Sequence, residues 1–132
     1  LGGYNYFSAG ITNQTGGLLR TMVFDEQQQA NYWPTSIQAV PANQWSHVAF
    51  VFKEKIGYQF YIDGQLTGGE QNAAWVFSNY SYATPRIGYG FPDESDQGFF
   101  NGQIDDVRVY NQALSQQAIC DIAHEGNPSL SC

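Results

Sequence analysis

Charge is scarce in this sequence, and positive charge is the scarcest. Only 13% of the 132 residues are charged, and five lysines and arginines stand against twelve aspartates and glutamates, for a net charge of −7. Such a surface repels phosphate backbones and anionic lipid, which argues against nucleic acid and membrane surfaces as partners. Soluble domains usually carry nearer ~25% charged residues. This low charge, beside 16% aromatic residues, indicates a secreted or extracellular all-β protein.

Long apolar runs are also missing. No stretch approaches the ~20 consecutive apolar residues that a membrane-spanning helix needs, so we expect no membrane insertion. The chain of 132 residues is long enough to bury one core without metals or many disulfides. The sequence therefore predicts a single domain over residues 1–132.

Cysteine and histidine each occur only twice. The sequence has no CxxC pair, and two histidines are too few for a zinc site of usual composition. Cys120 and Cys132 are close enough in sequence to form a disulfide that fixes the C-terminal tail and contributes roughly 2–3 kcal/mol. Two unlinked thiols are the alternative. His47 fits a hydrogen-bonded structural histidine better than a base or ligand, and His124 fits a dipole partner at a helix end.

Short alternating segments separated by turn residues predict most of the fold. Strands are predicted for residues 4–12, 18–24, 36–40, 45–52, 58–63, 86–89 and 103–110, with Trp75–Phe77 as a further edge strand. Residues 45–52 are almost all apolar or aromatic, which predicts a central strand covered on both faces. After Ser115, a plausible N-cap, the apolar spacing becomes helical and ends near Gly126. The pattern indicates an antiparallel β-sandwich with one short C-terminal helix.

The predicted strand at residues 103–110 carries two adjacent carboxylates. Asp105 shares a face with Val107 and Val109, so we expect it to be partly buried and held by backbone donors. Asp106 and Arg108 share the other face, where they can pair. Because Asp105 and Asp106 point to opposite faces, they cannot work together as an acid and base.

Four motifs in order resemble the laminin G-like domains of the concanavalin A-like lectin and glucanase superfamily. They are WSHVA at 45–49, YIDG at 61–64, IG at 87–88, and FNGQIDDVRVY at 100–110 followed by ALS at 113–115. The resemblance covers roughly residues 18–122 and implies a jelly-roll sandwich of two antiparallel sheets. The first strands of such domains have no counterpart here, and a sandwich without them would expose strand edges. We therefore expect a larger polypeptide, or other segments or subunits that complete the sandwich.

The resemblance also bears on catalysis. Glycoside hydrolases of this superfamily place two glutamates and an aspartate on one face of a strand, where acid and nucleophile flank the glycosidic bond. On the face of Asp105 the neighbouring positions hold Gln103 and Val107, so both glutamate positions are empty. No Ser-His-Asp or Cys-His set is recognisable. The sequence predicts that the protein is not an enzyme.

Calcium is the candidate cofactor. Asp93, Glu94 and Asp96 cluster in one loop, and clustered carboxylates suit a hard cation that takes six to eight oxygens. Pentraxins, which look like relatives, carry calcium ligands in an acidic loop at this place. They draw further ligands from a loop near the start of the matching region, where residues 13–17 offer no carboxylate. A solvated acidic turn is the alternative.

Aromatic residues in the predicted loops raise carbohydrate binding, because a sugar presents apolar faces with a rim of hydroxyls. The ligand-binding candidates are Tyr32, Trp33, Trp75 and Tyr80. Most aromatics of a sandwich nonetheless belong to its core. Two functions stay open: an extracellular adhesion or glycan-binding module, with calcium as its candidate cofactor, and a structural or protein-interaction subunit of an extracellular assembly that binds no sugar.

Overall fold

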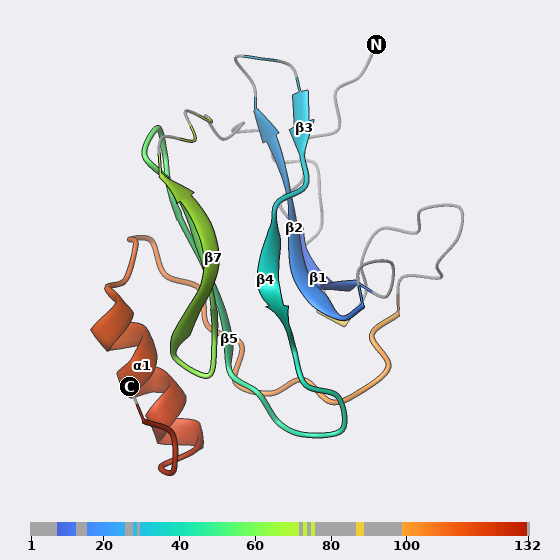
Figure 1. Ribbon diagram of the computed structural model, residues 1–132, viewed down its shortest axis with the longest axis vertical. Coiled ribbons are helices and arrows are strands. Elements are labelled where there is room, and N and C mark those ends of the chain that lie inside the picture. Colours follow the sequence, from blue (N-terminus) through green and yellow to red (C-terminus); the bar gives the residue numbers. More distant parts are fainter. Residues whose placement is uncertain are drawn as a thin grey trace.

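The computed structural model describes residues 8–12, 16–25, 28, 30–71, 73, 75, 87–88 and 99–131. Within these residues the chain forms seven strands and one helix (Figure 1). The elements are β1 (Ser8–Thr12), β2 (Leu18–Asp25), β3 (Ala30–Tyr32), β4 (Thr35–Ala39), β5 (Val48–Lys53), β6 (Gly57–Ile62), β7 (Gln65–Gln71) and α1 (Gln116–Gly126).

The strands form two antiparallel sheets that face each other. In one sheet β2 pairs with β1 on one side and with β3 and β4 on the other; the second sheet has the order β5-β6-β7. Figure 1 shows α1 on the outer side of the second sheet. This arrangement confirms the predicted antiparallel sandwich with one short C-terminal helix.

The core lies between the two sheets. Leu19 of β2 meets Phe60 and Ile62 of β6, so each sheet contributes its inward face. A second cluster joins Val23 to Trp75, whose ring stacks 5.0 Å from that of Tyr58. Burying a side chain of this size stabilises the fold by roughly 1.5–3 kcal/mol.

Local sequence signals explain the hairpin and the helix that frame this core. Asp63 and Gly64 both have positive φ, 50° and 78°, as a tight two-residue hairpin requires. A Cβ on Gly64 would lie 3.0 Å from Sγ of Cys120, so the missing side chain also lets α1 approach the hairpin. Oγ of Ser115 accepts a hydrogen bond from the backbone N–H of Ala118 at 3.2 Å, which confirms the predicted N-cap.

Two strand predictions are wrong. Residues 45–52 do not form a central strand: β5 begins at Val48 and, in the described part of the chain, pairs only with β6. Its apolar composition reflects an inward face, Phe50 and Phe52, rather than two covered faces. Residues 103–110 form no strand and are exposed along their whole length. β-branched residues favour a strand, but a strand also needs a neighbouring strand to form hydrogen bonds with its backbone.

Other predictions differ in smaller ways. Residues 65–71, which lie outside the predicted strands, form β7, because the turn at Asp63 and Gly64 returns the chain along β6 despite a glycine pair in the strand. The described part of the predicted strand 86–89, Ile87 and Gly88, is a bend. Trp75 lies outside any strand, and Val76 and Phe77 are outside the described residues.

Candidate functional site

The predicted sugar-binding aromatics have different surroundings. Trp33, between β3 and β4, is 48% exposed, and the guanidinium carbon of Arg20 lies 4.4 Å from the centre of its ring. Trp75 is 7% exposed and stacks on Tyr32, with ring centres 4.7 Å apart. Tyr80 lies outside the described residues. Trp33 therefore offers an open ring, whereas Trp75 packs in the core.

Tyr32 connects the core to the surface near Trp33. It is half-buried, and its hydroxyl donates a 2.6 Å hydrogen bond to Oε1 of Gln28. The cation of Arg20 is attracted to the negative face of the Trp33 ring, which holds both side chains together. An aromatic face beside guanidinium donors can stack on the apolar side of a sugar and hydrogen-bond its hydroxyls.

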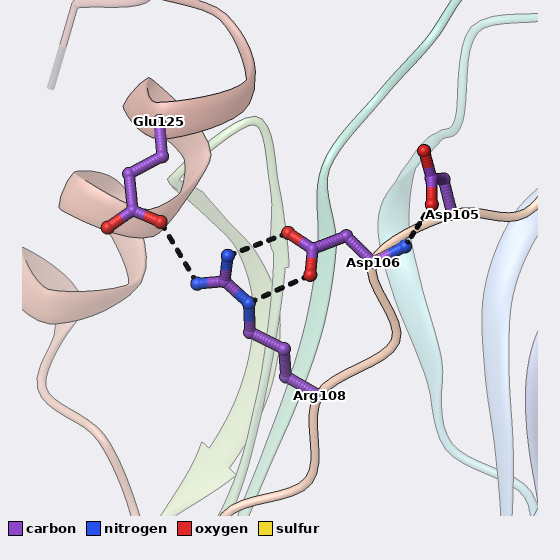
Figure 2. Close-up of polar contacts among 4 residues, drawn as sticks. All are labelled: Asp105, Asp106, Arg108 and Glu125. Carbon is purple, nitrogen blue, oxygen red and sulfur yellow. Dashed lines mark hydrogen bonds and ion pairs between the residues drawn. The ribbon is translucent and has the colours of Figure 1, made fainter.

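Residues 103–110 carry an ionic cluster that links them to α1 (Figure 2). Nε and Nη2 of Arg108 donate to the two carboxylate oxygens of Asp106 at 3.0 and 2.7 Å, and Nη1 donates to Oε2 of Glu125 at 3.0 Å. These hydrogen bonds, that to Asp106 first, raise the pKa of Arg108. The predicted pairing of Asp106 with Arg108 is confirmed. Asp105 is exposed, which corrects its expected burial; its Oδ1 accepts a hydrogen bond from the backbone of Asp106 at 2.8 Å.

The cluster does not offer an acid and base pair. Both oxygens of Asp106 accept hydrogen bonds from Arg108, so this carboxylate is occupied by its basic partner. Asp105 is exposed and takes no part in this ion pair. Figure 2 shows the two carboxylates turned away from each other. The arrangement suits a structural link rather than proton transfer.

His47 lies just before β5. Its backbone N–H donates to Oδ1 of Asp63 at 2.8 Å, and its carbonyl accepts from the N–H of Asp63 at 2.7 Å. Its Nδ1 is buried without a hydrogen-bond partner among the described residues. Burial lowers the pKa of His47; the charge of Arg108 acts in the same direction, while Asp63 and Asp106 oppose it. This geometry fits a structural histidine.

The lowered pKa of His47 predicts a loss of stability in acid. The folded protein binds this proton less readily than the unfolded chain, whose histidine titrates near 6.5. Stability is therefore highest above that pH, falls as the pH drops below it, and levels off below the folded-state pKa. Urea unfolding across this range should show the loss in the parent protein and in His124→Gln, but not in His47→Gln. An equal loss in His47→Gln would contradict this origin.

Metal binding at the acidic loop remains a prediction. Asp93, Glu94 and Asp96 lie outside the described residues. Among the residues that are described, no three histidine, cysteine, aspartate or glutamate side chains are grouped to hold an ion.

The predicted disulfide also involves a residue that the structure does not describe. Cys120, on α1, is buried and is not a free thiol in the structure. Its predicted partner, Cys132, lies outside the described residues. The pairing of Cys120 with Cys132 therefore stays a prediction.

A groove between β4 and β7 was not predicted from the sequence. Its volume is about 300 Å³, and its lining includes Ile37 of β4 and Leu66, Gly68, Gly69 and Glu70 of β7. A glycine pair inside a strand is the signal that could have indicated it, because such pairs mark places where another backbone comes close.

Comparison with known proteins supports the sandwich. A sequence-family model described as the concanavalin A-like lectin/glucanases superfamily matches residues 1–120. The human Adhesion G-protein coupled receptor D1 is 25% identical over 87 residues, which are 66% of this chain and 10% of the receptor. Within the described residues, no helix has the length and apolar character to cross a membrane.

A solved structure shares the fold. The crystal structure of an S-layer domain-containing protein (residues 221–444) from Clostridium thermocellum matches with a TM-score of 0.53 and 21% identity. The match covers 93% of this chain and 59% of that one. The chain thus spans less than two thirds of each of these relatives.

Proposed function

Because the chain belongs to the laminin G-like domains of the concanavalin A-like lectin/glucanases superfamily, we propose that it is a non-catalytic adhesion or carbohydrate-binding module that works outside the cell. One relative is named as an adhesion receptor, and a structural neighbour as an S-layer domain-containing protein. Both names fit a location at the cell surface. The low charge and high aromatic content of the sequence fit the same location.

The observation that carries glycan binding is the exposed ring of Trp33 held beside Arg20. An exposed aromatic ring is available to stack on the apolar face of a sugar. The cation–π contact with Arg20 favours one orientation of the Trp33 ring. A ring that is already oriented loses less conformational freedom when a sugar stacks on it, so more of the contact energy appears as affinity.

We extend the proposal to calcium. Asp93, Glu94 and Asp96 would supply carboxylate oxygens for the ion. Calcium bound by these side chains would then assist glycan binding. The proposed module is non-catalytic because, among the residues that the structure describes, Asp105 and Asp106 turn away from each other and cannot flank one glycosidic bond.

A glycan array, run once with calcium and once with a chelator, tests the proposal. We expect at least one bound glycan class, with affinity that falls about tenfold in Trp33→Ala through the loss of roughly 1.4 kcal/mol of stacking. Trp45→Ala is the matched control, because it removes another exposed tryptophan from a different part of the surface.

The two variants and the chelator separate the parts of the proposal. Equal losses in Trp33→Ala and Trp45→Ala would contradict a site at Trp33. Binding that persists unchanged in the chelator would contradict the role of calcium while leaving the aromatic contact intact.

A second function is favoured by a different observation. The described residues from 99 to 110 expose a continuous series of large apolar side chains: Phe99, Phe100, Ile104, Val107, Val109 and Tyr110. Val109 is 94% exposed. Patches of this kind commonly mark protein contacts. The alternative proposal is a structural subunit whose partner segments or subunits cover this surface, and silence across the glycan array in both conditions would favour it.

A further inference from the structure

The groove between β4 and β7 has apolar walls that nothing in the core requires. Ile37 of β4 is 81% exposed and Leu66 of β7 is 48% exposed, and both line the groove of about 300 Å³. Side chains that serve only the fold point inward, as Phe60 and Ile62 do on β6. These two instead offer apolar surface to whatever enters the groove.

The floor of the groove is backbone. Gly68 has φ +144°, and a Cβ on it would lie 3.3 Å from the backbone nitrogen of Ile37, so the two strands come close here. A Cβ on Gly69 would overlap the carbonyl oxygen of Tyr58. Neither position can carry a side chain without displacing backbone atoms of a neighbouring strand, so both hold glycine and no side chain projects from them into the groove. A slender, unbranched chain therefore fits the groove better than a bulky one.

The carboxylate of Glu70 gives the groove a negative charge. Glu70 is exposed, lines the groove and lies directly opposite Tyr58 in the pairing of β6 and β7. Each ion pair among the described residues involves Arg108, so Glu70 has no basic partner there. Burial and the negative charge of Glu70 raise the pKa of Tyr58, which keeps its phenol neutral. With a net charge of −7 over the whole chain, the groove attracts cations.

We propose that this groove binds the side chain of a lysine or arginine presented by a protein partner. The aliphatic stem lies along Ile37 and Leu66, and the cationic head reaches the carboxylate of Glu70. Lysine and arginine side chains commonly bury their stems in this way while their charged heads stay among polar groups. The contact is separate from the glycan contact proposed at Trp33, and either can hold without the other.

The test uses small probes that differ only in charge. The Nα-acetyl methylamide of arginine and that of citrulline are titrated to about 50 mM, which detects dissociation constants in the millimolar range. Binding is followed through the backbone amide NMR signals of Gly68 and Gly69. We expect the arginine probe to shift both signals and to bind about fivefold more tightly than citrulline, as a solvent-exposed ion pair allows.

Two variants test whether Glu70 causes the tighter binding of arginine than of citrulline. Glu70→Gln should bring arginine binding down to the level of citrulline, whereas Asp121→Asn, which removes one exposed carboxylate from α1, should leave it unchanged. Trp33→Ala should also leave it unchanged, which separates this site from the glycan site. Unshifted signals elsewhere in the spectrum establish that each variant is folded.

Several results would overturn the proposal. Equal affinity for arginine and citrulline would show an apolar slot without charge recognition. Absence of any shift at Gly68 and Gly69 would exclude the groove as a site for a basic side chain. Stronger shifts at the same glycines with a bound glycan from the array would assign the groove to sugar instead.

Discussion

Replacing Phe60 with alanine is expected to lower the free energy of unfolding by about 3–5 kcal/mol. The ring is 1% exposed and lies in the middle strand of its sheet, facing Leu19 of the opposite sheet. It also contacts the rings of Phe50 and Tyr58, with centres 5.2 and 5.8 Å away. Alanine would leave a cavity that neither sheet can fill, because the surrounding aromatics belong to both core clusters. Urea denaturation with a common m-value measures the loss.

Phe100→Ala is the matched control. It removes the same side chain from an exposed position, where substitutions usually change stability by less than about 0.5 kcal/mol. A loss of about 1 kcal/mol or less in Phe60→Ala would contradict a core centred between β2 and β6. An equally large loss in Phe100→Ala would show that residues 99–110 are covered in solution.

Gly57→Ala is expected to lower the free energy of unfolding by about 3 kcal/mol through two backbone effects. Gly57 begins β6 with φ +151°, a region that favours glycine, and a Cβ there would overlap the carbonyl oxygen of Glu70 on β7. Either the pairing of β6 with β7 must open or the turn after β5 must change. Thermal and urea unfolding both measure the effect.

Alanine substitutions at Gly16 and Gly10 separate the effect of positive φ from the effect of the collision with Glu70. Gly16 also has positive φ, +71°, but a Cβ there would meet nothing within 4 Å, so Gly16→Ala should cost only about 1 kcal/mol. Gly10 in β1 has open space and no positive φ, so Gly10→Ala should be close to neutral. Similar losses at Gly57 and Gly16 would show that the collision with Glu70 is relieved at little cost.

Features that depend on a few neighbouring residues could be predicted from the sequence. The β1–β2 hairpin follows from alternating residues on both sides of a turn, and the turn at Asp63 and Gly64 follows from the left-handed conformations these residues tolerate. Ser115 as N-cap needs only the backbone N–H of Ala118, three residues away. In each case the interaction is encoded within the segment itself.

Features that depend on residues far apart in the sequence could not be predicted in this way. Whether β5 is central or at an edge is decided by what lies beside it, and its composition is the same in both cases. Residues 103–110 have strand composition but no described strand to pair with. The groove required β4 and β7 to be brought together from separate sheets, which no local pattern reports.

The surroundings of the two candidate tryptophans, Trp33 and Trp75, could be predicted only in part. Trp33 is exposed because Pro34, with no N–H to donate, separates β3 from β4 and leaves the tryptophan between them. Trp75 stacks between Tyr32 and Tyr58, because β3 and β6 supply aromatic rings on both sides of it. Composition alone could not separate a surface ring from a core ring.

The contact between β4 and β7 makes the two flanks of the sandwich different from each other. The backbone N–H of Gln38 donates to Oγ1 of Thr67 at 2.9 Å, and the absent side chain of Gly68 lets the strands meet, so this flank of the sandwich is closed. In the described part of the chain, β1 and β5 lie on the opposite flank, and each pairs with one neighbour only. Strands added there would extend both sheets away from the contact between β4 and β7.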